Sequence, residues 1–95
     1  MALLSDTEIK TALAGVPGWE LAGAEIVKEY KFADFNAAMA FVNRVAEAAE
    51  AANHHPDIDI RWNKVRLALS THSQGGLTSN DFALASQIEG LAAPA

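Results

Sequence analysis

The chain has 95 residues, of which 51% are hydrophobic and 20% charged, and its formal net charge is −5. This length predicts one domain over residues 1–95 that buries somewhat over ~60% of its unfolded surface, which favours a shallow pocket or one completed by a second subunit. The acidic balance argues against nucleic-acid binding, and the absence of cysteine excludes disulfides, thiol catalysis and thiolate metal sites. Neither a signal peptide nor a membrane span of ~20 apolar residues is evident, so we expect a cytoplasmic protein without membrane contact.

The first predicted element is a helix that begins at a capping box. Ser5 and Glu8 have the spacing of that motif, and Leu4 and Ile9 have the spacing of a hydrophobic staple. Gly15 then ends the helix.

Two short strands and a longer helix are predicted next. The strands cover 19–22 and 26–32, where apolar and polar residues alternate around a Gly-Ala turn. Asp34 caps the following helix, and Asn53, which tolerates the left-handed conformation, ends it. The apolar positions of this helix recur at helical spacing, at Phe35, Ala38, Phe41, Val42, Val45, Ala49 and Ala52.

A second hairpin is predicted from two alternating segments, with apolar residues at Ile58, Ile60 and Trp62 and again at Val65, Leu67 and Leu69. A two-residue turn at Asn63-Lys64 places all six on one face and pairs Trp62 with Val65, Ile60 with Leu67, and Ile58 with Leu69. By itself, Trp62 is best interpreted as a core residue.

The last predicted helix follows a glycine loop and runs to about Leu91. Thr78 and Asp81 form a second capping box, and Leu77 with Phe82 a second staple. The fold class is therefore α+β, a four-stranded antiparallel sheet with three helices on one face, in the order α-β-β-α-β-β-α.

All three histidines lie at the open end of the second predicted hairpin. His54 and His55 precede its first strand and His72 follows its second, so the hairpin brings them together. Imidazole both gives and takes a proton near neutral pH, and Glu50, one turn before the helix end, can hydrogen-bond a histidine. Taken alone, each residue has a structural explanation, such as a cap for Asp81, but their joint spacing indicates a proton-transfer pocket.

The chain resembles the pterin-4a-carbinolamine dehydratases, whose pattern it matches at Glu50-x3-His54-His55-Pro56-x5-Trp62-x9-His72-x8-Asp81. The resemblance covers nearly the whole chain. It implies dehydration of 4a-hydroxytetrahydropterin to quinonoid dihydropterin in tetrahydrobiopterin recycling, downstream of aromatic amino-acid hydroxylases. It also implies that there is no metal or redox cofactor and that the chain forms a homodimer or homotetramer.

Carried over residue by residue, the resemblance makes the catalytic residues His54, His55 and His72. It makes Glu50, Pro56 and Asp81 supporting residues, and the stretch Thr71-His72-Ser73-Gln74 the other wall of the pocket. The flat pterin also offers amide-like edges to backbone groups of Asp57 and of the segment from Ser70 to His72. One departure is Ile58, where many family members carry an aromatic residue.

Two other functions compete with the dehydratase. A metal site at Glu50, His54, His55 and His72 is disfavoured, because adjacent histidines rarely reach one ion and no His-x3-His pair exists. A non-catalytic interaction module of the same fold is the remaining alternative, although an idle pocket has no need for three histidines.

Overall fold

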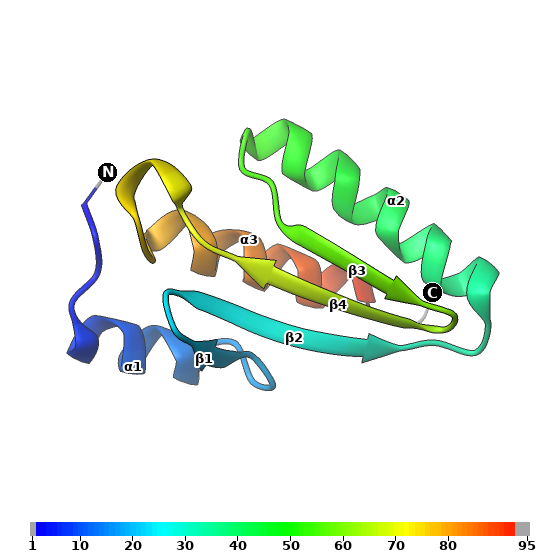
Figure 1. Cartoon of the computed structure of the whole chain (residues 1–95), viewed down its shortest axis with the longest axis horizontal. Coiled ribbons are helices and arrows are strands. Elements are labelled where there is room, and N and C mark those ends of the chain that lie inside the picture. Colours follow the sequence, from blue (N-terminus) through cyan, green and yellow to red (C-terminus); the bar gives the residue numbers. More distant parts are fainter. Residues whose placement is uncertain (1, 93–95) are drawn as a thin grey trace.

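The computed structural model describes residues 2–92, and its order of elements confirms the prediction (Figure 1). The helices are α1 (Asp6–Ala14), α2 (Phe35–Ala52) and α3 (Ser79–Ala92), and the strands are β1 (Glu20–Ala22), β2 (Glu25–Lys31), β3 (Asp57–Arg61) and β4 (Lys64–Leu69). A short 3-10 helix, η1 (His72–Gln74), which was not predicted, leads into the glycine loop.

The helix ends follow the chemistry read from the sequence. Both halves of the capping box between Ser5 and Glu8 are formed. The Asp34 carboxylate accepts a hydrogen bond from the backbone N–H of Ala37 at 2.8 Å. At the other end of α2, Asn53 adopts the left-handed conformation, with φ 50° and ψ 43°. These caps fix where the chain enters and leaves α2, and the histidines follow directly.

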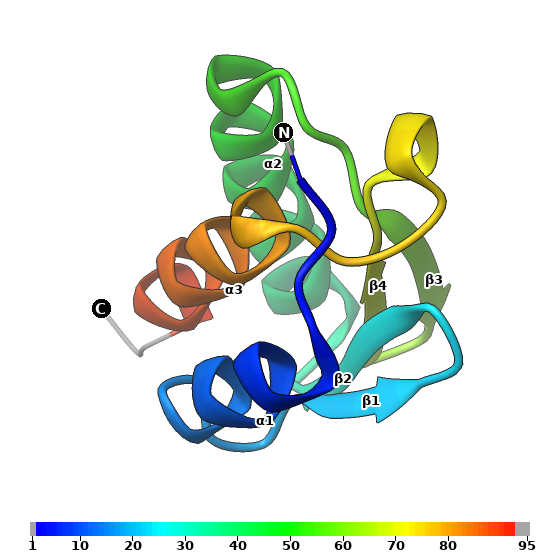
Figure 2. The same cartoon turned by 90° about the vertical axis from the view of Figure 1, so that its left-hand side faces the viewer.

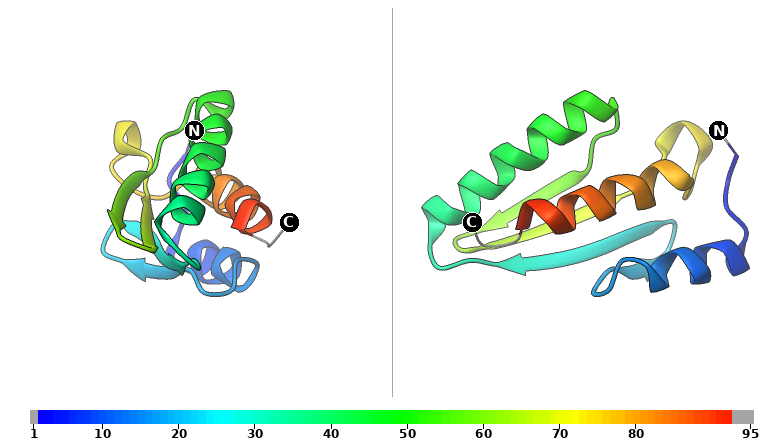
Figure 3. Two further views of the ribbon diagram at one scale, coloured as in Figure 1. Left: turned by 90° about the vertical axis from the view of Figure 1, so that its right-hand side faces the viewer. Right: turned by 180° about the vertical axis from the view of Figure 1, so that it is seen from behind.

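The four strands form one antiparallel sheet in the order β1-β2-β4-β3, with the three helices on one face (Figure 2). Seen from behind, the helices lie in front of the sheet (Figure 3, right). The hydrophobic core lies between these layers and includes the fully buried residues Ile26, Phe41, Val45, Leu67, Leu69 and Ile88. The outer face of the sheet carries charged side chains.

The register of the β3–β4 hairpin differs from the prediction by two residues. Ile60 pairs with Val65 and Ile58 with Leu67, so the turn is made by Trp62 and Asn63. A shift of two residues keeps each side chain on its predicted face. The isoleucines therefore still face the helices, although β3 is an edge strand and Ile58 remains 37% exposed.

The interpretation of Trp62 as a core residue was wrong. This side chain is 70% exposed, and its residue has a positive φ of 54° at the hairpin turn. The cause is the neighbouring Asn63, which is buried and bonds twice to the end of β2. Its side-chain amide donates to the carbonyl of Phe32 at 2.9 Å, and its own carbonyl accepts from the Phe32 N–H at 2.8 Å. Asn63 thus fixes the turn, and Trp62 is left outside the core.

A cluster of polar contacts attaches the C-terminal half of α3 to β2. Oε1 of Glu89 accepts from Lys28 Nζ at 2.5 Å, from Trp19 Nε1 at 3.1 Å, and from the hydroxyl of Tyr30. Burial first, and then the hydrogen bond to Glu89 and its charge, raise the pKa of Tyr30 well above its usual value. Burial tends to raise the pKa of Glu89, but the three donors outweigh it and the net shift is downward.

Candidate active site

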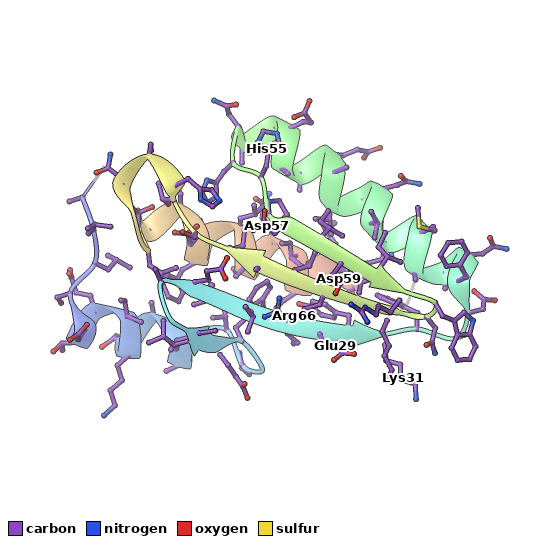
Figure 4. All side chains as sticks on the ribbon, in the orientation of Figure 1. Glu29, Lys31, His55, Asp57, Asp59 and Arg66 are labelled. Atoms are coloured by element: carbon purple, nitrogen blue, oxygen red, sulfur yellow. The ribbon has the colours of Figure 1, made fainter. Side chains whose placement is uncertain are left out.

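The predicted catalytic residues gather where α2, β4 and α3 meet. His54 and His55 follow the last turn of α2, His72 begins η1 after β4, and Asp81 lies in the first turn of α3. Figure 4 shows His55 beside the end of α2 and Asp57 below it at the start of β3. Segments far apart in the sequence therefore form one surface, as the hairpin argument predicted.

The end of α2 sets the position of His54 through its backbone. The N–H of Asn53 donates to the carbonyl of Glu50, and the N–H of His54 donates to the carbonyl of Ala49 at 3.1 Å. Together with the left-handed conformation of Asn53, these two hydrogen bonds form a Schellman motif. The backbone of His54 is thus part of the helix terminus, and its side chain is directed from a rigid support.

His54 is paired with a buried carboxylate. Its Nε2 lies 2.6 Å from Oδ1 of Asp81, and the two side chains are 12% and 0% exposed. A carboxylate this deeply buried requires hydrogen-bond donors to replace water. Asp81 has them, because its Oδ2 accepts from the hydroxyl of Thr71 at 2.8 Å and from the backbone N–H of Thr78 at 2.9 Å.

Asp81 therefore serves the fold and the site together. Its bond to the Thr78 N–H is one half of the predicted capping box, while the Thr78 hydroxyl bonds to the Asn80 N–H and to Thr71. Sequence reasoning gave Thr78 only a capping role. The sequence signal that linked Thr78 to the site was its spacing from Asp81. The hydrogen bond of Thr78 to Thr71, seven residues earlier, forms only in the folded chain.

His55 forms a second, exposed pair. Its Nε2 lies 2.5 Å from Oε2 of Glu50, and these side chains are 55% and 76% exposed. Water competes for both groups, so this contact holds His55 far less firmly than Asp81 holds His54. The two adjacent histidines thus have different environments, one enclosed and one open to solvent.

His72 is exposed and adjoins the network through its neighbour Thr71. Within residues 2–92, its imidazole has no hydrogen-bond partner in the structure. Its ring nitrogens are available to a ligand. His54 and His72 therefore present two imidazoles from different segments, linked through Asp81 and Thr71.

The remaining predicted residues surround these groups to different degrees. Pro56 is half-buried and Asp57 is exposed at the start of β3, while Ser70 is buried at the end of β4. Ser73 and Gln74 are exposed in η1. Trp62 is not part of the site in one copy of the chain, because the β3–β4 hairpin separates its turn from the histidines.

Two concavities of the surface lie away from the histidines. One of about 630 Å³ opens on the outer face of the sheet and includes Glu29, Lys31, Asp59 and Arg66 (Figure 4). None of the histidines lines it. Among residues 2–92, no group of three or more ligand side chains is placed to hold a metal ion. Nor does this part of the chain contain a helix of the length and apolarity needed to cross a membrane.

Comparison with known sequences extends over almost the entire chain. A family model described as pterin 4 alpha carbinolamine dehydratase matches residues 2–91. An Acidobacterium capsulatum protein with the provisional name pterin-4-alpha-carbinolamine dehydratase is 58% identical over 91 residues, which are 96% of this chain and 99% of that protein. A Chloroflexus aurantiacus protein with the same provisional name is 58% identical over 89 residues, covering 94% and 96%.

Two solved structures are similar to this fold. A Brucella melitensis protein described as a transcriptional coactivator/pterin dehydratase superposes with a TM-score of 0.94 at 32% identity, covering 97% of this chain and 100% of that one. A pterin dehydratase-like protein described as a RuBisCO assembly factor in the alpha-carboxysome gives 0.67 at 20% identity, covering 81% and 89%. The second shows a shared fold alone.

Proposed function

Since the chain belongs to the pterin 4 alpha carbinolamine dehydratase family, we propose that it converts 4a-hydroxytetrahydropterin to quinonoid dihydropterin and water. The observation that carries this proposal is the enclosed pair of His54 and Asp81, with His72 beside it. We place the reaction in tetrahydrobiopterin recycling, after an aromatic amino-acid hydroxylase. Its location in the cytoplasm stays a prediction.

The reaction needs one proton supplied and one removed. The bond between carbon 4a and its hydroxyl breaks, and the leaving oxygen takes a proton and departs as water. The lone pair of the ring nitrogen forms the new C=N bond, and this nitrogen gives up its own proton. Imidazoles perform both transfers near neutral pH, and the histidines as a set end with no net change in protons.

We assign the histidines different roles in this scheme. Carbon 4a is a stereocentre, so its hydroxyl projects from either face of the ring. His54 and His72 come from different segments and would protonate the leaving group from opposite faces. His55, held loosely by Glu50, would bind the pterin and accept the ring proton.

The other predicted residues would complete the binding surface. Pro56 and Asp57 lie on the strand side of the histidines, and Ser70, Ser73 and Gln74 lie on the loop side. Because sheet edges are usually paired or protected, we propose that the enzyme is a homodimer or homotetramer. The unpaired edge of β3, next to the histidines, is where a second copy would contribute most.

Breakdown of 4a-hydroxytetrahydropterin, followed by stopped-flow absorbance, tests the proposal. The wild-type chain should accelerate the reaction, and the double variant His54→Ala/His72→Ala should not. Circular dichroism checks that both are folded. A folded wild-type chain that leaves the rate at its value in buffer would support the alternative, a non-catalytic interaction module.

A further inference from the structure

We infer that Thr78 and Thr71 are positioning residues, which fix His54 in the tautomer that carries its proton on Nε2 and leaves Nδ1 for the substrate. They do so through two hydrogen bonds that run in the same direction. Thr78 donates to Thr71, and Thr71 donates to Asp81. The identity of the substrate rests on the proposed function, whereas the tautomer does not.

The direction of these hydrogen bonds follows from counting protons. The hydroxyl of Thr71 has one proton, and its bond to Oδ2 of Asp81 at 2.8 Å uses it, because a carboxylate only accepts. The second bond of this hydroxyl, to the hydroxyl of Thr78 at 2.8 Å, must then be one that Thr71 accepts. Thr78 is therefore the donor in the first of the two bonds.

The same count decides the proton of His54. Oδ2 of Asp81 accepts from the Thr71 hydroxyl and the Thr78 N–H, and Oδ1 lies 2.6 Å from His54 Nε2. Two acceptors do not bond to each other, so Nε2 must carry a proton for this contact to be favourable. Neutral His54 then has its lone pair on Nδ1, and protonated His54 has its transferable proton there.

Burial makes this arrangement firm. The exposed fractions of Asp81 and Thr78 are 0%, and that of Thr71 is 7%. Water is therefore a poor substitute for a lost partner, and an unpaired buried hydroxyl or carboxylate is costly. The exposed pair of His55 and Glu50 has no such enclosure, so its imidazole remains free to change tautomer.

A fixed tautomer of His54 matters for the proposed reaction. A general acid must present its proton in one geometry, and a histidine that divides its population between two tautomers does so only part of the time. Asp81 holds His54 by Nε2, and Thr71 and Thr78 hold Asp81. Thr71 would thus act through His54 and not by contacting the pterin with its hydroxyl.

Nitrogen-15 NMR of the imidazoles tests the tautomer without any substrate. At a pH where imidazoles are neutral, we expect the His54 signals, assigned by their loss in His54→Gln, to show a proton on Nε2. Thr71→Val and Thr78→Val should shift them toward a mixture of tautomers, and the matched variants Thr71→Ser and Thr78→Ser should not. A wild-type chain with the proton on Nδ1 would overturn the inference, even if no valine variant folds.

Kinetics provide the second measurement. Loss of a group that orients a functional histidine costs roughly 10–100-fold at metal sites. We expect a decrease of about 10-fold in kcat for Thr71→Val with KM unchanged, and recovery in Thr71→Ser. Equal kcat in the two folded variants would refute the positioning role. An inactive wild-type chain with the expected NMR signals would instead refute the proposed function and leave the tautomer standing.

Discussion

At the scale of single residues, the site contrasts an enclosed histidine with two open ones. His54 is surrounded by protein and bonded to Asp81, whereas His55 and His72 are exposed. In the proposed reaction, enclosed His54 and exposed His72 would share one task, protonation of the leaving hydroxyl, from different surroundings. His54 would then act from a fixed position, and His55 and His72 would adjust to the bound pterin.

If His54 and His72 both protonate the leaving hydroxyl, they should partly replace each other. Removing a positioned acid or base typically costs about 10²–10⁴-fold, so His54→Ala and His72→Ala should each lose less than that in kcat. The double variant should lose far more than the product of the single losses. Stopped-flow rates for the three variants check this expectation. Losses that simply multiply would show that the two histidines act in series.

Tyr30 should make stability depend on pH in the alkaline range. Its pKa is raised by burial and by Glu89, so the folded chain keeps the phenol protonated while the unfolded chain ionises near the usual value of 10.0. The unfolded state then binds fewer protons, and stability falls as pH rises through and above 10.0. Urea unfolding on both sides of this pH should show the decrease in the wild-type chain and a smaller one in Tyr30→Phe. The same slope in both proteins would contradict the prediction.

At the scale of elements, the ends of helices do more than stop the backbone. Asn53 closes α2 and directs the chain toward His54, and Asp81 opens α3 and holds the same histidine. The terminus of one helix and the beginning of another thus determine where the imidazole lies. The position of His54 is thus set by helix caps, which are local features that the sequence predicts.

The left-handed conformation of Asn53 allows a direct test. Alanine in this conformation is strained, so Asn53→Ala should lower the free energy of unfolding by about 1 kcal/mol. Asn53→Gly should be near wild type, because glycine adopts the conformation without strain. Urea titrations of the three proteins provide the comparison. If the alanine variant is as stable as the glycine variant, backbone strain at this position is not significant.

The elements were predictable because their signals are local. Periodicity predicted the strands and helices. The capping motifs predicted the start of α1, at Ser5, and both ends of α2, at Asp34 and Asn53. The turn of the second hairpin was not predictable, since it depends on bonds between Asn63 and Phe32, which are 31 residues apart. The histidine cluster followed from spacing around the hairpin. The hydrogen-bonded hydroxyls behind it were not predictable, because their contacts form only in the folded chain.

At the scale of the whole molecule, we expect the free edge of β3 to govern how copies of the chain associate. In an antiparallel pair centred on Ile60, Asp59 of each copy faces Arg61 of the other, and both side chains are largely exposed. Opposite charges across such a pair are favourable, and like charges are not. A pair centred on Asp59 would instead oppose two carboxylates. Antiparallel pairing also brings the hairpin turn of one copy to the histidine end of the other.

The cysteine-free sequence makes this register measurable. Ile60→Cys should form a disulfide between two copies under mild oxidation, and Asp59→Cys should form much less. The wild-type chain should sediment at a multiple of 10.1 kDa at micromolar concentration. A monomeric mass, or efficient linking through Asp59→Cys alone, would contradict the predicted pairing.

The two tryptophans lie in different environments, so their fluorescence reports on two different events. Trp19 is 4% exposed and bonded to Glu89, while Trp62 is 70% exposed at the hairpin turn. Emission from an enclosed indole is blue-shifted and that from a hydrated one is red-shifted, so the two contributions separate in one spectrum. Denaturant should move the blue component as α3 detaches from β2. If copies pair through β3 as proposed, dilution should move only the red component, as Trp62 leaves the neighbouring copy, and the same sample would report folding and assembly independently.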